Sequence, residues 1–176
     1  AAIESHIFDD IFVSTEDEEI KEISKKYHCK VLNRLNSLAT DSSTIVEVIL
    51  SHLKEFNSIG KKYDYVYCLY PTAPLRNKND LINISNIFEK QINVDSVMAV
   101  TNFSHYPFQA LRINHEKIIQ PFWPEYISKR STELPNLVAG NGSTYAIKTD
   151  LFLKHKSFLL PDNNYAYEME SWRSLD

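Results

Sequence analysis

Apolar and polar positions alternate between strand-like and helix-like patterns over the first hundred residues. Short runs of β-branched and aromatic residues are typical of buried strands, whereas apolar residues three and four positions apart predict a buried helix face. The expected strands lie at 11–13, 30–32, 63–70 and 96–101. The expected helices begin after 14–15 and after 41–44, and a third covers 81–88. This alternation predicts an α/β fold, a mainly parallel sheet with helices on both faces.

Two of the expected helices are preceded by residues that can cap them. Ser14 and Thr15 stand before an acidic run, and residues 41–44 stand before the apolar stripe of the next helix. Hydroxyl and carboxylate oxygens accept hydrogen bonds from the free N–H groups of a first helical turn. Helix capping is therefore a sufficient explanation for Ser14 and Thr15.

The pattern changes at about residue 102. Aromatic residues become frequent and follow no helical or strand period until a turn and strand at 141–148 and a short helix at 150–154. We expect a single domain over residues 1–176 with an irregular arm at about 103–135. So many rings without a period would leave an exposed apolar patch on a monomer, which favours a subunit interface.

Composition and charge narrow the functional classes. The chain has 176 residues, of which 43% are hydrophobic and 24% charged, with a net charge of −4. An acidic balance weighs against nucleic acid or an anionic membrane as the main partner. The two cysteines, Cys29 and Cys68, lack any metal-ligand spacing, which indicates reduced thiols and a cytoplasmic protein.

Glycine is scarce. Average usage of about 7% would give roughly 12 glycines, but the chain has three, so no glycine-rich phosphate loop can be present within it. The chain opens without Met, as if inside a helix, and closes on residues 174–176 as if a further element began there. These features predict a fragment truncated at both ends.

The stretch at 71–76, Pro-Thr-Ala-Pro-Leu-Arg, is the strongest candidate for a ligand loop. It follows the carboxyl end of an expected central strand, where open α/β sheets bind ligands. A stiff connector with a surface arginine is the alternative explanation. Asn141-Gly142 is explained by a turn, and His105 by packing or a surface position. The residues alone predict an α/β domain with a ligand loop and leave its chemistry open.

Several stretches, taken in order, resemble the acylneuraminate cytidylyltransferases, the CMP-sialic acid synthetases. They lie at 11–19 (IFVSTEDEE), 39–46 (ATDSSTIV), 69–76 (LYPTAPLR), 141–145 (NGSTY) and 173–176 (RSLD). The resemblance implies a nucleotide-diphosphosugar-transferase-like fold, a homodimer and a Mg²⁺-dependent enzyme. The implied reaction joins CMP from CTP to a nine-carbon nonulosonic acid and releases pyrophosphate, for bacterial surface glycans or flagellin.

Finer features are similar to the pseudaminic acid branch of that family. Tyr70 stands where sialic acid enzymes usually have Gln, Ala73 replaces a loop serine, and residues 106–111 and 123–126 also resemble that branch. Asn141-Gly142 is closer to the sialic and legionaminic acid enzymes. The identity of the sugar therefore stays open.

The resemblance also implies site residues. The nucleotide-binding candidates are Ser14, Thr72, Ala73 and Arg76. The sugar-binding candidates are Tyr70, Gln109, Asn141, Tyr145 and Phe158. Arg130, one position from the family register, is the catalytic candidate that would hold the sugar carboxylate, because a guanidinium group binds a carboxylate through two hydrogen bonds. Asp176 is the catalytic and metal-binding candidate, since carboxylates suit Mg²⁺.

The chain also departs from the family pattern. The family's glycine-rich phosphate loop would precede residue 1, and the second aspartate of its Asp-x-Asp motif would follow Asp176. We therefore expect the 176 residues by themselves to be inactive. Two alternatives remain: an octulosonate-type or other sugar nucleotidyltransferase of the same fold, and a truncated, non-catalytic dimerising domain.

Overall fold

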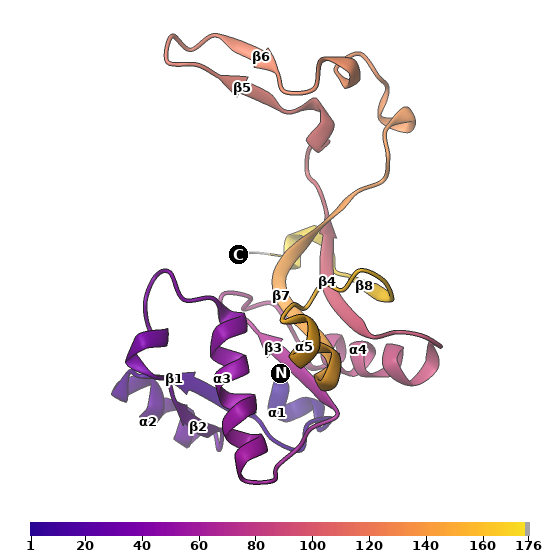
Figure 1. Ribbon diagram of the computed structural model, residues 1–176. Helices are drawn as coiled ribbons and strands as arrows, with labels where there is room; N and C mark the ends of the chain where they lie inside the picture. The colour runs from indigo at the N-terminus through magenta and orange to yellow at the C-terminus, as the bar shows by residue number, and fades with distance from the viewer. Residues whose placement is uncertain (175–176) are drawn as a thin grey trace.

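Helices and strands alternate along the chain in the computed structural model, which describes residues 1–174 (Figure 1). The strands are β1 Phe12–Thr15, β2 Lys30–Asn33, β3 Tyr65–Leu69, β4 Ser96–Asn102, β5 Leu111–Ile113, β6 Ile119–Pro121, β7 Val138–Lys148 and β8 Asn164–Glu168. The α-helices are α1 Ala2–Ser5, α2 Glu18–Lys26, α3 Ile45–Ser58, α4 Lys78–Lys90 and α5 Thr149–His155. The 3-10 helices are η1 Asn36–Leu38, η2 Pro107–Gln109, η3 Pro124–Tyr126, η4 Ser131–Glu133 and η5 Ser171–Arg173.

The main sheet has four strands in the order β3-β7-β4-β8. β7 is antiparallel to both β3 and β4, whereas β8 is parallel to β4. A separate parallel pair is formed by β1 and β2. The α/β class and the helices on both faces are confirmed.

The expectation of mainly parallel pairing is wrong for the main sheet. Three of its four strands run in one direction, but β7 lies between two of them in the opposite direction. The physical reason is the connection: β4 leads into the arm and β7 returns directly from it, and a strand that returns beside its predecessor pairs antiparallel. Because the sequence between the two strands follows no regular pattern, the antiparallel direction of β7 could not be predicted from it.

Apolar side chains on the two faces of the sheet form two cores. On one face, Leu53 and Phe56 of α3 and Phe152 of α5 pack with Cys68 and Ile147 of the sheet. On the other face, Ile84 of α4 packs with Val97 and Ala146. Alternate residues of β7 point to opposite faces, as the period of a strand requires. A strand buried on both sides therefore lies at the centre of the sheet.

The helix starts follow from capping chemistry. The cap expected within residues 41–44 is Thr44, which forms a reciprocal capping box with Glu47 at the start of α3. α2 is capped by Asp17, whose carboxylate accepts a hydrogen bond from Ile20 N. The expectation that Ser14 and Thr15 cap this helix is therefore wrong. Both residues belong to β1, which ends at Thr15, before the first turn of α2.

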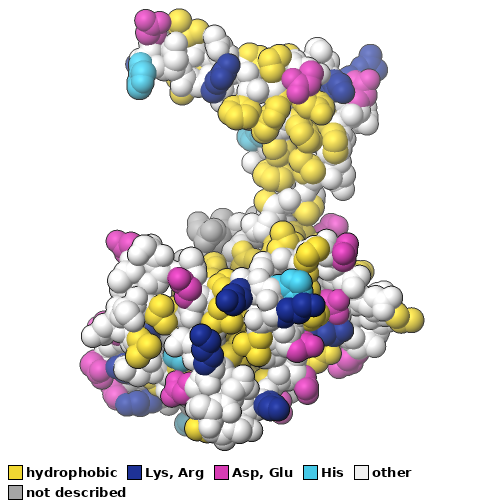
Figure 2. All heavy atoms as spheres, in the orientation of Figure 1, with side chains coloured by type: hydrophobic (Ala, Val, Ile, Leu, Met, Phe, Trp, Pro, Cys, Tyr) yellow, Lys and Arg dark blue, Asp and Glu magenta, His cyan; other side chains and the backbone are white. Residues whose placement is uncertain are grey.

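The segment between β4 and β7 projects away from the body (Figure 1). It contains the short antiparallel pair β5-β6 and three 3-10 helices. Hydrophobic side chains gather on its visible surface (Figure 2). The exposed large hydrophobic residues between 103 and 137 are Phe103, Tyr106, Leu111, Ile113, Ile118, Ile119, Phe122, Ile127 and Leu137. We call residues 103–137 the arm.

Within residues 1–174, no helix has both the length and the apolar character needed to cross a bilayer.

Candidate active site

The ligand loop predicted from the sequence lies directly after β3 and beside the middle of β7. Arg76 fixes it there: its Nη1 donates hydrogen bonds to the carbonyl oxygen of Tyr70 at 3.1 Å and to that of Ser143 at 2.5 Å. Burial lowers the pKa of the Arg76 guanidinium. Ala73 is buried, whereas Thr72 is exposed. Arg76 therefore holds the loop against β7, and the loop presents Thr72 outward.

Three aromatic rings form a row beside this loop. The ring centroids of Tyr70 and Tyr145 are 5.5 Å apart, and those of Tyr145 and Phe158 are 5.6 Å apart. Phe158 is buried and also packs on Phe152 of the core, at 4.7 Å. The three sugar-binding candidates Tyr70, Tyr145 and Phe158 are thus brought together, with Phe158 at the inner end.

Asn141 is fixed inside the protein. Its side chain is buried, its Nδ2 donates to Ser174 Oγ at 3.0 Å and contacts Met169 Sδ at 3.2 Å, and its Oδ1 accepts from Ser143 N at 3.1 Å. Ser143 therefore links two candidates, because its carbonyl oxygen binds Arg76 and its amide binds Asn141. Asn141 therefore ties β7, next to the loop, to the segment that contains Met169 and Ser174.

Ser14 lines a cavity that also reaches Tyr70 and Pro71. The cavity has a volume of about 290 Å³ and is lined by β1, β2, α3 and the end of β3, including Ser14, Arg34, His52 and Tyr70. Ser14 Oγ lies 2.8 Å from His52 Nε2, and the carbonyl oxygen of Ser14 accepts from Arg34 Nη2 at 2.7 Å. Burial lowers the pKa of His52, so the neutral imidazole is favoured.

Arg34 and His52 line this cavity and are not among the candidates predicted from the sequence. A signal for His52 was present: it lies four residues after Val48 and four before Phe56, on the buried stripe of α3. A histidine on such a stripe needs a polar partner, since burying an unpaired ring nitrogen is costly. Arg34 follows a short strand and had no comparable signal.

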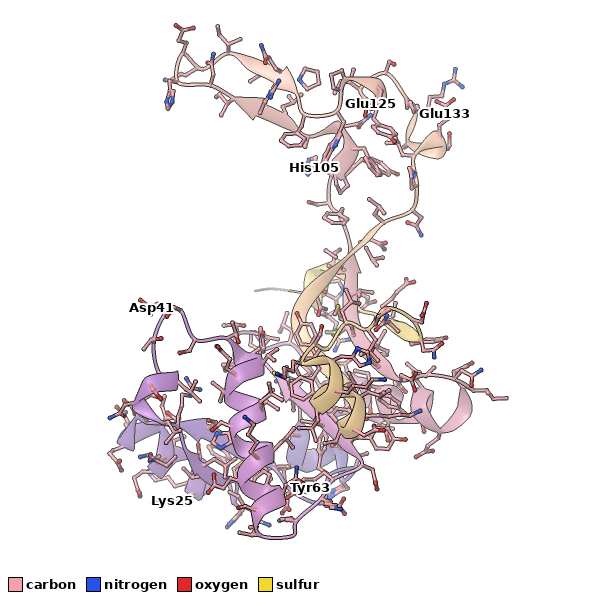
Figure 3. The ribbon with its side chains drawn as sticks, in the orientation of Figure 1. Lys25, Asp41, Tyr63, His105, Glu125 and Glu133 are labelled. Carbon is pink, nitrogen blue, oxygen red and sulfur yellow. The ribbon has the colours of Figure 1, made fainter. Side chains whose placement is uncertain are left out.

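Gln109 and Arg130 belong to the arm and are not brought together with the other candidates. Gln109 Nε2 donates to the carbonyl oxygen of Lys129 at 3.2 Å, and Arg130 is exposed before η4. His105 is also on the arm, where Nδ1 lies 3.3 Å from Ser104 Oγ (Figure 3). The arm extends away from the loop, so the two groups of candidates lie apart within one chain (Figure 1).

The structure cannot place the predicted metal ligand, because Asp176 lies outside the described residues 1–174. Among those residues, no group of three or more His, Cys, Asp or Glu side chains is arranged to hold a metal ion.

The fold is similar to those of two solved structures. It is similar to a solved CMP:2-keto-3-deoxy-manno-octonic acid synthetase complexed with CTP, with a TM-score of 0.63 and 13% identity over 97% of this chain and 76% of that one. It is also similar to a 4-diphosphocytidyl-2C-methyl-D-erythritol synthase from Anaerococcus prevotii, with a TM-score of 0.58 and 13% identity over 95% and 72% of the two chains. At this identity, the likeness defines the fold alone.

The family is defined by sequence. Residues 1–117 match the cytidylyltransferase family model. The pseudaminic acid cytidylyltransferase of Campylobacter jejuni serotype O:2 is 33% identical over 92% of this chain and 73% of that protein. The N-acylneuraminate cytidylyltransferase of Streptococcus agalactiae serotype V is 29% identical over all of this chain and 42% of that protein. The chain belongs to the cytidylyltransferase family and is a nucleotidyltransferase, which confirms the resemblance and its pseudaminic acid branch features.

Proposed function

We propose that this protein transfers CMP from CTP to a nonulosonic acid of the pseudaminic acid type and releases pyrophosphate. The observation that carries the proposal is the position of the loop at 71–76, which follows β3, beside the ring row of Tyr70, Tyr145 on the neighbouring β7, and Phe158 after α5. This arrangement places the exposed Thr72 and the loop backbone beside an aromatic wall at the carboxyl end of β3. Such a site suits a nucleotide next to a bulky sugar.

In the reaction, the anomeric hydroxyl of the sugar acid attacks the α-phosphorus of CTP in line. A new P–O bond forms, the bond to the β-phosphate oxygen breaks, pyrophosphate leaves with the electron pair, and the hydroxyl proton passes to solvent. Phosphoryl chemistry of this kind depends mainly on positioning and on neutralisation of charge. The residues of this chain therefore act by holding the two substrates in line.

Each group of residues has a part in this positioning. Thr72 and the backbone of the loop bind the nucleotide, with Arg76 fixing the loop from behind. Ser14, which lines the same cavity as Tyr70, binds the nucleotide in an orientation set by His52. Tyr70 and Tyr145 contact the sugar, and Phe158 forms the inner wall of the pocket for an acyl group. Asn141 fixes the irregular part of β7 beside them through its hydrogen bond from Ser143 N.

The metal is part of the proposal. Mg²⁺ supplies neutralisation of the phosphate charge when bound, and Asp176 is the ligand that the family resemblance indicates. Activity that disappears on chelation and returns with Mg²⁺, but returns equally with Mn²⁺ or Ca²⁺, would support a divalent cation without selectivity for Mg²⁺. No recovery with any of these ions would contradict the metal requirement.

The arm completes the site of a second subunit in this proposal. Gln109 and Arg130 lie on a segment that extends away from the loop of its own chain (Figure 1). In a homodimer each arm reaches the partner, where Arg130 binds the sugar carboxylate through paired hydrogen bonds. The exposed apolar residues of the arm favour such an interface.

The test is a pyrophosphate-release assay on the protein expressed from its complete open reading frame. CTP and MgCl₂ are supplied with pseudaminic, legionaminic, N-acetylneuraminic or octulosonic acid in parallel, and the sugar nucleotide is identified by ³¹P NMR. We expect the highest kcat/KM with pseudaminic acid. Highest activity with octulosonic acid would favour the octulosonate-type alternative, and no pyrophosphate with any acid would favour a non-catalytic domain. The inactivity of the 176 residues by themselves stays a prediction, which the same assay on that chain checks.

A further inference from the structure

A buried carboxylate at the start of α4 gathers hydrogen bonds from three segments of the chain. Only 2% of the Asp80 side chain is exposed. Its Oδ2 accepts from Asn77 N at 2.8 Å and forms an ion pair with Arg173 Nη2, and its Oδ1 accepts from the Tyr167 hydroxyl at 3.0 Å. Asp80 thus joins the helix start to β8 and to η5, which is distant in sequence.

Arg173 extends this connection to the ligand loop. The same Nη2 donates a hydrogen bond to the carbonyl oxygen of Leu75 at 3.1 Å. The next residue, Ser174, accepts from Asn141 Nδ2 and donates to the carbonyl oxygen of Glu170 at 3.1 Å. The loop is therefore held on two sides, by Arg76 against β7 and by Arg173 against η5.

Stability alone is a poor explanation for this arrangement. Buried ion pairs often stabilise a fold no more than well-packed apolar residues do, because desolvation offsets the attraction of the charges. A planar guanidinium with several fixed donors is suited to holding separate acceptors in one geometry. One of those acceptors, Leu75, belongs to the loop on which the proposed function depends.

We propose that Arg173 is a positioning residue: through Asp80 and the Leu75 carbonyl it fixes the loop at 71–76 for CTP without touching the substrate. This inference rests on the proposed function. It assigns Arg173 of the RSLD stretch a role separate from that of Asp176.

The experiment compares Arg173→Met, Asp80→Asn and the double variant in the complete protein. Each single variant leaves a buried group without its partner and lowers thermal stability. The double variant removes both charges and regains stability. If Arg173 positions the loop, the double variant still shows kcat/KM for CTP lowered roughly 10- to 100-fold, since small misplacements of a bound substrate have effects of that size. Lys90→Met, an exposed change at the other end of α4, serves as the matched control and leaves kcat/KM unchanged.

Arg173→Lys keeps the charge but has a single flexible nitrogen, which cannot reproduce the guanidinium geometry at both acceptors. We expect it to fold normally and to show a higher KM for CTP with a smaller change in the KM for the sugar acid. The proposal would be overturned if the double variant and Arg173→Lys were both stable and both had normal kinetics. The ion pair of Asp80 and Arg173 would then serve only to stabilise the fold.

Hydrogen–deuterium exchange separates this inference from the proposed function, because it needs no turnover. In the double variant we expect faster amide exchange in residues 71–77 and unchanged exchange in α3. Absence of activity in the unaltered protein would count against the proposed function alone. Unchanged exchange in 71–77 would count against the positioning role whether or not the protein turns over CTP.

Discussion

The imidazole Nε2 of His52 lies 2.8 Å from the hydroxyl oxygen of Ser14, and this contact joins the middle of α3 to the end of β1. His52 is 9% exposed, and its Nδ1 has no hydrogen-bond partner among the described residues. Glu55 Oε2 lies 3.8 Å from that nitrogen. A proton on Nδ1 would face Glu55 and leave Nε2 to accept from Ser14, whose oxygen lone pairs then stay available in the cavity.

The first prediction concerns the pH dependence of stability. Burial lowers the folded-state pKa of His52 below the ordinary value of 6.5, with Glu55 opposing the shift. The unfolded chain therefore binds this proton first, so the contribution of His52 is fully present above pH 6.5 and is lost as the pH falls below it. We expect the melting temperature to fall below pH 6.5, and to fall less steeply in His52→Gln, measured by circular dichroism between pH 5 and 8. Equal dependence of the melting temperature on pH in the unaltered protein and in His52→Gln would contradict the prediction. His155→Gln, at an exposed position, is the control.

A second prediction concerns Asp10, which holds the start of β1 to two distant segments. Its carboxylate pairs with Lys30 and Lys61 and accepts a hydrogen bond from the Tyr63 hydroxyl, and these partners lower its pKa. We expect Asp10→Asn to lower the free energy of unfolding at pH 7 by about 1.5–3 kcal/mol, the typical contribution of hydrogen bonds to a charged group. Urea denaturation measures the difference.

The same variant has a defined pH dependence. The folded-state pKa of Asp10 lies below the ordinary value of 3.8, so its contribution is present above pH 3.8 and is lost as the pH falls further. The stability gap between the unaltered protein and Asp10→Asn should therefore narrow in acid. Asp162→Asn, at an exposed position, should change stability little at any pH. A gap that widens in acid would show that the ion pairs are not its cause.

A third prediction concerns sugar preference. The ring of Tyr70 packs on Tyr145 beside the loop. A contact of this kind between two rings has a favourable interaction energy of about 0.5–1.5 kcal/mol. We expect Tyr70→Gln to lower kcat/KM for pseudaminic acid about 2- to 10-fold, the effect of losing a ring contact with the sugar of about 0.5–1.5 kcal/mol. The kcat/KM for N-acetylneuraminic acid should fall less. Tyr165→Gln, at an exposed tyrosine of β8, is the control. An equal fall with both sugars would assign Tyr70 to the nucleotide or to folding.

A fourth prediction concerns the arm. Phe122 is 55% exposed and packs on Trp123 with ring centroids 4.7 Å apart. We expect the unaltered protein to sediment as a dimer and the Phe122→Asp, Trp123→Asp double variant to sediment as a monomer, because charges on an apolar interface must be desolvated. Ile92→Asp tests an exposed apolar residue outside the arm and should leave the dimer intact. A folded protein that stays monomeric at high concentration would refute the dimer arm.

Local rules predicted much of the body. The strand predicted at 63–70 corresponds to β3 Tyr65–Leu69, and the cap predicted within 41–44 is Thr44 at the start of α3. These features depend on neighbours within a few residues of each other. β8 was missed, because its five residues are mostly exposed and show no apolar run.

The candidate site likewise combines features that the local sequence predicts with contacts between distant residues that it does not. Spacing indicated the loop at 71–76, and the resemblance indicated Tyr70 and Tyr145, which the structure brings to a centroid distance of 5.5 Å. The partners that hold the loop, Ser143 and Arg173, lie 67 and 97 residues after Arg76, with Ser143 bound to Arg76 itself and Arg173 to the adjacent Leu75. No local pattern connects groups at such separations.

The sequence by itself determined the α/β class, the helix caps at Thr44, the loop between Pro71 and Arg76 and the family, because each is carried by residue types at short spacing. The tertiary structure alone decided that β7 returns antiparallel between β3 and β4, that His52 meets Ser14, and that Asp80 is buried against Arg173. The physical reason is that pairing direction and buried polar contacts depend on how distant segments pack together. A carboxylate or imidazole can be buried only where packing also supplies its partner.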